Sequence, residues 1–158
     1  MATNPIVYIL CGVPTAGKST WADSISAFHL PCKIISRDTI RLQAFQLKDY
    51  SQYVFNTENE KQVTKIFNMY LDDAKVRRQN IILDNTHVRE KYLDDAIKDF
   101  EAAGYTVKIK FFTVSVLTSY IRNLKRRIIE KKYVPWKTMK QMRRNFESIN
   151  REKYKKYE

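Results

Sequence analysis

The sequence predicts an α/β fold of three layers, in which helices cover both faces of a parallel sheet of four to five strands. Short apolar runs alternate with amphipathic helical patterns along the 158 residues, which is typical of this class. A glycine-rich loop joins the first run to the first helix, and two of the three glycines of the chain lie in that loop. The last third is basic and helical in pattern, and we interpret it as a lid over the sheet.

The strands follow from continuous apolar runs, because a parallel strand is buried on both faces. These runs predict strands at residues 5–11, 33–35, 80–83 and 105–113. Apolar residues at helical spacing predict helices over 21–28, 58–78 and 92–100, the last ended by Gly104, and two basic helices separated near Pro135. We expect one domain over residues 1–158, with the lid and the basic helical C-terminal segment at about 115–158.

Composition excludes several classes of protein. The hydrophobic content of 44% suffices for a buried core, so the chain as a whole is not disordered. No apolar run approaches the roughly 18 residues that suggest a membrane span, and the N-terminus lacks the basic region of a secretory signal. Two cysteines make no disulfide framework. We therefore expect a reduced protein without a membrane partner, located in the cytoplasm (the host cytoplasm if the chain is encoded by a phage).

The positive charge is concentrated in the last third. The net charge is +12; through Thr106 the chain has 13 Lys and Arg and 13 Asp and Glu, whereas residues 107–158 have 16 and 4. Such an asymmetry indicates a polyanionic partner.

The loop after the first strand fits the pattern G-x-x-x-x-G-K-[ST] at every fixed position. Its glycines let backbone N–H groups surround a phosphate, and the following helix adds a favourable dipole. A chance glycine-rich turn is the alternative, but the strand before and the helix after make it improbable. Lys18 can reach the β- and γ-phosphates of ATP, and the Ser19 hydroxyl can bind Mg²⁺. The predicted nucleotide contacts are Gly12, Val13, Pro14, Thr15, Ala16, Gly17, Lys18, Ser19 and Thr20.

The end of the second strand carries Asp38 and Arg41. If a helix begins near Ser36, the two side chains lie three residues apart on one face. Asp38 could then accept the proton of an attacking hydroxyl, while Arg41 holds an anionic group of the acceptor. The alternative is a favourable charge at a helix N-terminus and a surface arginine.

The third strand ends in Asp84-Asn85-Thr86-His87. Asp84 lies where P-loop enzymes often place a carboxylate for Mg²⁺. Asn85 and Thr86 could contact phosphate or a neighbouring loop, although helix capping would also explain these residue types. His87 could be an ordinary surface histidine, and we leave it outside the predicted catalytic set.

Arg122 and Arg126 share one face of the first basic helix. Phosphoryl transfer needs cations near the γ-phosphoryl oxygens, so these arginines are candidates for a catalytic lid; the alternative is a solvated basic helix.

Together, the phosphate loop, Ser36-Arg37-Asp38-x-x-Arg41, Asp84-Asn85-Thr86 and Arg122-Asn123-x-Lys125-Arg126 resemble the phage-type 5′-polynucleotide kinases over about residues 6–146. The resemblance implies a P-loop kinase that transfers the γ-phosphate of ATP to a 5′-hydroxyl end of DNA or RNA. It implies that Lys18 and Ser19 contact phosphate and Mg²⁺, that Asp38 is the general base, that Arg41 binds the acceptor strand, and that Arg122 and Arg126 reach the ATP phosphates. Family members often have Asn at the position of His87.

Two other functions remain open at this stage. One is a P-loop kinase of a small phosphorylated or sugar-nucleotide acceptor, including a zeta-toxin-like enzyme; the other is a non-catalytic nucleic-acid-binding module. The C-terminal segment interleaves basic residues with Phe146, Tyr154 and Tyr157, which would suit stacking on a nucleic-acid strand. However, apolar residues at helical spacing also predict that the segment 136–149 packs on the domain or on another subunit, which makes a homo-oligomer possible.

Overall fold

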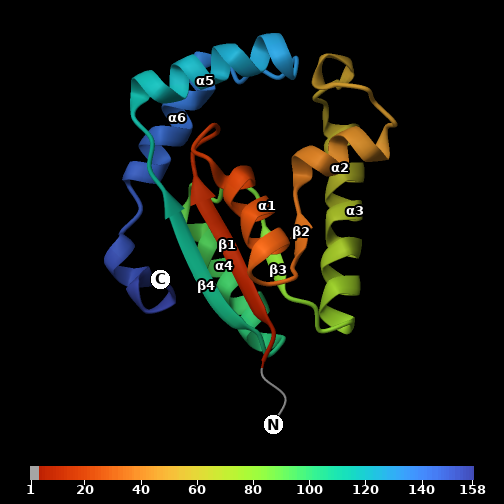
Figure 1. Ribbon diagram of the computed structural model, residues 1–158, viewed down its shortest axis with the longest axis vertical. Helices are drawn as coiled ribbons and strands as arrows, with labels where there is room; N and C mark the ends of the chain where they lie inside the picture. Colours follow the sequence, from red (N-terminus) through yellow and green to blue (C-terminus); the bar gives the residue numbers. More distant parts are fainter. Residues whose placement is uncertain (1–3) are drawn as a thin grey trace.

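The computed structural model describes residues 4–158, and a four-stranded sheet forms its centre (Figure 1). The strands have the order β2–β3–β1–β4, and all three pairings are parallel. Their bounds are β1 Ile6–Gly12, β2 Lys33–Ile35, β3 Ile81–Leu83 and β4 Thr106–Phe112. The predicted α/β fold with a parallel sheet is therefore confirmed.

Helices cover both faces of the sheet (Figure 1). α1 packs on one face, and α3 and α4 pack on the other. α5 crosses above the carboxyl ends of the strands, with α6 beside it. The helices are α1 Lys18–Phe28, α2 Arg37–Ala44, α3 Thr57–Val76, α4 Glu90–Ala102, α5 Val116–Ile129 and α6 Trp136–Glu147; two short 3-10 helices are η1 Tyr50–Gln52 and η2 Arg151–Tyr157.

The central strand β1 is buried on both faces, as its apolar sequence predicts. Ile9 contributes to the larger core with α3 and α4, whereas Leu10 packs against Ala22 of α1. Both β1 side chains are completely buried. Burial of each stabilises the fold by about 1.5–3 kcal/mol, so the strand that leads into the phosphate loop is firmly held.

The parallel sheet brings distant polar segments to one edge. The segments that follow β1, β2 and β3 begin at Val13, Ser36 and Asp84, and all three strands end at the same edge because they run parallel. The predicted nucleotide and acceptor residues therefore meet at the carboxyl ends of the strands, beneath α5.

The C-terminal segment is part of the core, so the predicted stacking surface is wrong. Phe146 and Tyr154 are only 5% and 1% exposed and cannot stack on a nucleic-acid strand. The Arg151 guanidinium lies over the Phe146 ring at 4.8 Å, and the Tyr154 hydroxyl donates to Asp94 of α4 at 2.8 Å. Burial of Met139, Phe146 and Ile149 confirms the alternative that this segment packs on the domain.

Between residues 4 and 158, no helix is both long enough and apolar enough to cross a bilayer.

Candidate active site

The phosphate loop joins β1 to α1 in a tight curve. Gly17 has φ 95°, in the left-handed region that favours glycine, and immediately precedes α1. A Cβ on Gly12 would lie 2.9 Å from the carbonyl oxygen of Phe112, so glycine is needed where β4 approaches. Helix α1 begins at Lys18, inside the motif and three residues before its predicted start, and its N-terminal N–H groups face the loop.

Lys18 points into the curve of this loop. Its ammonium donates to the carbonyl oxygens of Gly12 at 3.0 Å and Val13 at 2.8 Å. Burial lowers the pKa of Lys18 to about 8, against the opposing charge of Asp84. The loop thus holds a cation where a bound phosphate chain would lie.

Ser19 and Asp84 form a pair of oxygen ligands beside Lys18. The Ser19 hydroxyl donates to Oδ2 of Asp84 at 2.6 Å, joining the start of α1 to the end of β3. Burial raises the pKa of Asp84, while this hydrogen bond and the charge of Lys18 oppose the rise. A hydroxyl and a carboxylate are ligands that suit Mg²⁺, which keeps several waters and binds few protein groups in nucleotide sites. Among residues 4–158, no group of three or more His, Cys, Asp or Glu side chains could hold a metal ion.

Asp38 and Arg41 lie on one face of α2, as predicted. Arg41 Nη1 donates to Oδ1 of Asp38 at 2.9 Å. The other carboxylate oxygen, Oδ2, is paired with the ammonium of Lys132 from the loop between α5 and α6. Burial tends to raise the pKa of Asp38, but Lys132, Arg41 and Tyr50 together outweigh this effect and the pKa is lowered. Asp38 is therefore ionised at neutral pH and able to accept a hydrogen bond.

Arg41 is held on its other side by Glu60 of α3, which sequence analysis missed. Nε and Nη2 of Arg41 donate to the two Glu60 oxygens, each at 2.9 Å, and the Tyr53 hydroxyl donates to the same carboxylate at 2.7 Å. This fork-like pair fixes the arginine and, through it, Asp38. The carboxylates of Asp38 and Glu60 thus balance the charge of Arg41. The sequence analysis predicted that Arg41 binds an anionic group of the acceptor.

Asn85 and Thr86 contact protein backbone. The Asn85 side-chain oxygen accepts from the N–H of Arg37 at 3.2 Å, so it caps α2, the helix after β2, and not the helix that follows it in the sequence. The Thr86 carbonyl accepts from the N–H of Gly12 at 3.0 Å and supports the start of the phosphate loop. Asn85 thus supports the start of α2, and Thr86 supports the start of the phosphate loop.

His87 is not an ordinary surface histidine. Its Nδ1–H donates to the carbonyl oxygen of Leu10 at 3.1 Å, and its backbone is left-handed, with φ 43°. Burial lowers the pKa of His87 to about 4, so the ring is neutral at physiological pH. It joins the loop after β3 to the centre of β1, a structural role that the sequence motif did not indicate.

The base of the lid is fixed to the phosphate loop. The Thr15 hydroxyl lies 3.0 Å from the buried Ser119 hydroxyl of α5, and Arg122 Nη1 donates to the Thr15 carbonyl at 3.0 Å. Arg122 therefore contacts the backbone of the phosphate loop, and its contact with the ATP phosphates stays a prediction.

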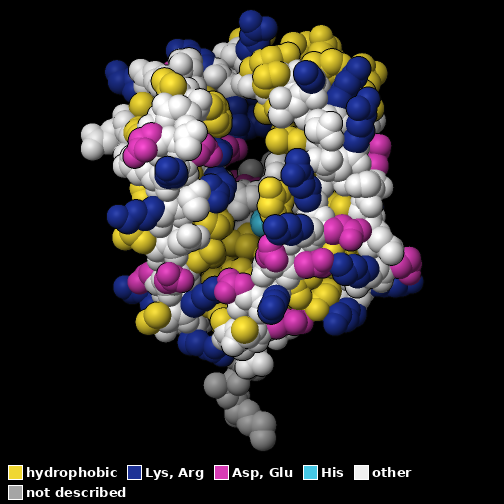
Figure 2. Space-filling model, turned by 180° about the vertical axis from the view of Figure 1, so that it is seen from behind, with side chains coloured by type: hydrophobic (Ala, Val, Ile, Leu, Met, Phe, Trp, Pro, Cys, Tyr) yellow, Lys and Arg dark blue, Asp and Glu magenta, His cyan; other side chains and the backbone are white. Residues whose placement is uncertain are grey.

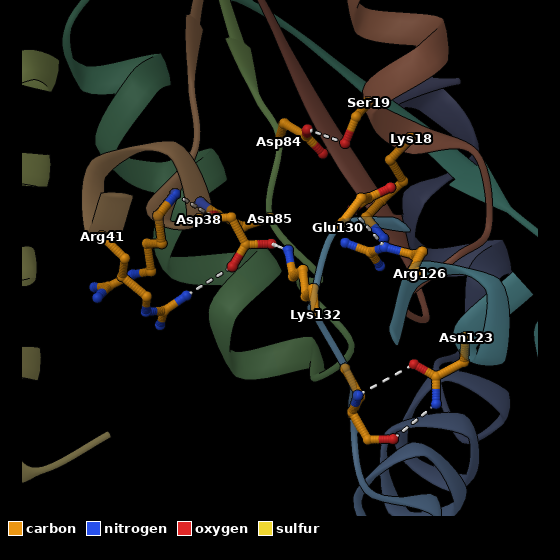
Figure 3. Close-up of polar contacts among 12 residues, drawn as sticks. Lys18, Ser19, Asp38, Arg41, Asp84, Asn85, Asn123, Arg126, Glu130 and Lys132 are labelled. Atoms are coloured by element: carbon orange, nitrogen blue, oxygen red, sulfur yellow. Dashed lines mark hydrogen bonds and ion pairs between the residues drawn. The ribbon is translucent and has the colours of Figure 1, made fainter. Parts of the chain in front are cut away.

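The rest of the lid brings Arg126 and Lys132 over the site (Figure 3). Arg126 Nε donates to Glu130 at 3.1 Å, and the charge of Arg126 acts on the pKa of both Lys18 and Lys132. The buried Asn123 fixes the loop between α5 and α6 (the lid loop), because its amide donates to the Val134 carbonyl at 2.8 Å and accepts from the Val134 N–H at 3.1 Å. Asn123 occurs in the sequence motif, but its partner was not predictable.

The space-filling view shows the molecule hollowed between two sides bridged at the top (Figure 2). Two ion pairs join the loop between α5 and α6 to α2 and to the residue before η1: Lys132 with Asp38, and Lys131 with Asp49 at 3.1 Å. The arrangement places a phosphate loop, an ionised carboxylate and several cations around one space, which is the equipment needed for phosphoryl transfer.

A family model described as AAA domain matches residues 7–149. Among solved structures, a chain of the Pnkp1/Rnl/Hen1 RNA repair complex has a TM-score of 0.77 and 22% identity, and the match covers 100% of this chain and 48% of that one. The PezAT toxin–antitoxin system of Streptococcus pneumoniae gives 0.62 and 20%, covering 79% and 54%. A Janibacter sugar kinase gives 0.60 and 14%, covering 94% and 80%.

These similarities show the fold, which is that of the P-loop kinases. The chain spans about half the length of the RNA repair chain. None of the curated protein sequences matches it.

Proposed function

The chain belongs to the AAA domain family, and we propose that it is a polynucleotide 5′-hydroxyl kinase, which transfers the γ-phosphate of ATP to the 5′-hydroxyl end of DNA or RNA. The observation that carries the proposal is the Asp38 carboxylate of α2, which is held by Arg41 on one side and has Lys132 and Arg126 on the side of the phosphate loop (Figure 3). The motif similarity to phage-type 5′-polynucleotide kinases rests in part on Asp38 and Arg41.

The donor side fits ATP with Mg²⁺. The loop from Gly12 to Thr20 offers N–H groups and the Lys18 ammonium to the phosphates, and Ser19 and Asp84 offer oxygen ligands to the metal. Bound there, Mg²⁺ would neutralise negative charge on the phosphates. Arg122 and Arg126 would contribute positive charge from the lid, where charge develops during transfer.

On the acceptor side, Asp38 is proposed as the general base. Its carboxylate would accept the hydrogen bond of the 5′-hydroxyl and hold the oxygen in line with the γ-phosphorus. The new phosphorus–oxygen bond forms as the bond to the β-phosphate oxygen breaks, ADP leaves, and the hydroxyl proton passes to the Asp38 carboxylate. Arg41 and Asn85 support this geometry, the first by fixing Asp38 and the second by capping its helix. The predicted contacts of Arg41, Asn85 and Thr86 with the acceptor remain part of the proposal.

A polynucleotide acceptor is favoured by the charge of the lid. Several basic side chains of α5 and α6 form no ion pair with another residue in the described part of the chain: Lys125, Arg127, Lys137, Lys140 and Arg144. A nucleic-acid strand presents a phosphate at each nucleotide and can use such cations, whereas a small acceptor gains little from them. An RNA repair complex among the structural neighbours is consistent with this acceptor class.

The test is labelling with γ-labelled ATP and Mg²⁺ on 5′-hydroxyl DNA and RNA oligonucleotides, a nucleoside 3′-monophosphate and a panel of nucleoside monophosphates. We expect label on the oligonucleotides, reduced at least about 10²-fold by Asp38→Asn, which preserves shape but cannot take the proton. Asp23→Asn, an exposed aspartate of α1, is the matched control.

Salt dependence separates the substrate classes. For an oligonucleotide we expect KM to rise steeply with salt, because its binding releases counterions. Label only on a small acceptor, with a KM indifferent to salt, would replace the polynucleotide assignment by a small-molecule kinase.

A further inference from the structure

A lysine of the loop between α5 and α6 contacts the proposed general base. The ammonium of Lys132 is paired with Oδ2 of Asp38 and lies 4.3 Å from the centre of the Tyr50 ring. Its side chain is only 13% exposed. Asn123 fixes the same loop through Val134, so the position of Lys132 is part of the folded lid.

The two oxygens of Asp38 are held in different ways. Oδ1 accepts from Arg41 on the same helix, and Arg41 is itself fixed by both oxygens of Glu60. Oδ2 is held by Lys132, whose long stem can carry the ammonium to another position. Movement of the Lys132 side chain would therefore free Oδ2 of its ion pair, while the Tyr50 hydroxyl stays beside the carboxylate.

Lys132 also shares its surroundings with the cations proposed to meet ATP. Figure 3 shows its ammonium between Asp38 and the guanidinium of Arg126. Burial lowers the pKa of both Lys18 and Lys132, and the charge of Arg126 lowers both further. The other groups facing Lys132 are Glu130, which directly follows α5 and is paired with Arg126, and the Tyr50 ring of η1. Lys18 of the phosphate loop and Arg126 and Lys132 of the lid thus surround a space that suits an anion with more than one negative charge.

We propose that Lys132 exchanges partners during the reaction cycle: it leaves Oδ2 of Asp38 for the γ-phosphoryl group of ATP, and thereby releases Asp38 to receive the acceptor hydroxyl. The proposal rests on the function proposed above, because it takes ATP as donor and Asp38 as the base. A γ-phosphoryl group carries more charge than one carboxylate and is flanked by Arg126, so it competes effectively for the ammonium. ADP lacks that group and leaves Lys132 on Asp38. The lid lysine therefore couples the presence of a transferable phosphate to access to the base.

The first test measures nucleotide binding by calorimetry, without catalysis. Lys132→Met removes the ammonium and keeps most of the stem. The matched control is Lys131→Met, a neighbour on the same loop whose 61% exposed side chain pairs with Asp49. We expect the wild type and Lys131→Met to prefer the Mg²⁺ complex of a β,γ-imido ATP analogue over that of ADP. Lys132→Met should lose about tenfold of this preference, the effect of one charge-assisted contact worth about 1.4 kcal/mol.

ADP affinity in the same titrations reports whether the phosphate loop is intact in each variant. The exchange would be overturned if Lys132→Met bound ADP as tightly as the wild type does and also kept the full wild-type preference for the ATP analogue. Lys132→Arg, which restores a cation, should recover most of the preference; no recovery would also count against a phosphate contact.

The second test measures binding of a 5′-hydroxyl oligonucleotide by fluorescence anisotropy. In the wild type and in Lys131→Met, the ATP analogue should tighten oligonucleotide binding severalfold; in Lys132→Met, this enhancement should disappear because Asp38 is already accessible. An equal enhancement in all three proteins would refute the exchange. If no variant binds the oligonucleotide but Lys132→Met still loses its nucleotide preference, the acceptor class is wrong and the exchange stands.

Discussion

His87 should determine part of the acid side of the stability profile. Its imidazole donates from Nδ1 to the carbonyl oxygen of Leu10 within the sheet, and burial lowers its pKa from 6.5 to about 4. In the unfolded chain the ring regains the ordinary pKa. Between pH 6.5 and 4 the unfolded state therefore binds more protons than the folded state, and the free energy of unfolding falls as the pH falls.

The magnitude follows from the two pKa values. Each pKa unit corresponds to about 1.4 kcal/mol, so the difference between 6.5 and about 4 amounts to roughly 3 kcal/mol when fully developed. This is a substantial fraction of the stability of an ordinary domain, about 5–15 kcal/mol. The contribution is complete above pH 6.5 and is lost progressively down to about pH 4.

His87→Asn is the informative substitution, because Asn tolerates the left-handed backbone that His87 adopts at φ 43°. Urea unfolding at several pH values between 7 and 4.5 gives the free energy of unfolding of both proteins. We expect the wild type to lose about 2–3 kcal/mol more than His87→Asn over this range. His29→Asn, which removes the exposed histidine after α1, should keep the wild-type slope. If the free energy of unfolding fell equally with pH in the wild type and in His87→Asn, the imidazole of His87 would not be held neutral by burial.

Two further substitutions test the framework around the site. Glu60→Gln removes the charged partner of Arg41, so Asp38 loses its fixed position. We expect the free energy of unfolding to fall by about 1–2 kcal/mol in denaturant titration and turnover to fall about tenfold in steady-state kinetics. Unchanged turnover would contradict a positioning role of Glu60. Asn123→Ala leaves the N–H and carbonyl of Val134 without their partner, and denaturant titration should show a free energy of unfolding lower by about 2 kcal/mol. The control is Gln141→Ala at an exposed position of α6. Equal stability of the two variants would contradict the role of Asn123 in fixing this loop.

Features carried by contiguous residues could be predicted from the sequence. The phosphate loop is one segment between a buried strand and a helix, so its identity follows from local spacing. The contact between Asp38 and Arg41 also follows from helical periodicity, once a helix begins near Ser36. The sheet follows from apolar runs, since a buried parallel strand has no polar face.

Contacts between distant segments could not be predicted in this way. Glu60 lies 19 residues after Arg41, and Lys132 lies 94 residues after Asp38, so no local pattern pairs them. The ambiguity at Phe146 and Tyr154, where both stacking and packing were open, has a different origin. Aromatic residues among basic ones suit both stacking and packing, and in the structure burial against the sheet takes both rings.

The cations proposed to meet phosphate share one property that explains how such a charged site remains folded. Each has a protein oxygen as partner: Lys18 contacts loop carbonyls, Arg122 the carbonyl of Thr15, Arg126 the carboxylate of Glu130, and Lys132 that of Asp38. Arg122 is exposed, but Lys18, Arg126 and Lys132 are at least partly buried, and without partners such cations would destabilise the fold by several kcal/mol. Phosphate binding must therefore exchange existing contacts for new ones, and its net gain is smaller than the sum of the new contacts. Among these partners, only Asp38 is also proposed to act on the acceptor. An exchange at Lys132 would therefore also free the proposed base, whereas exchanges at the other three cations would act on the phosphate groups alone.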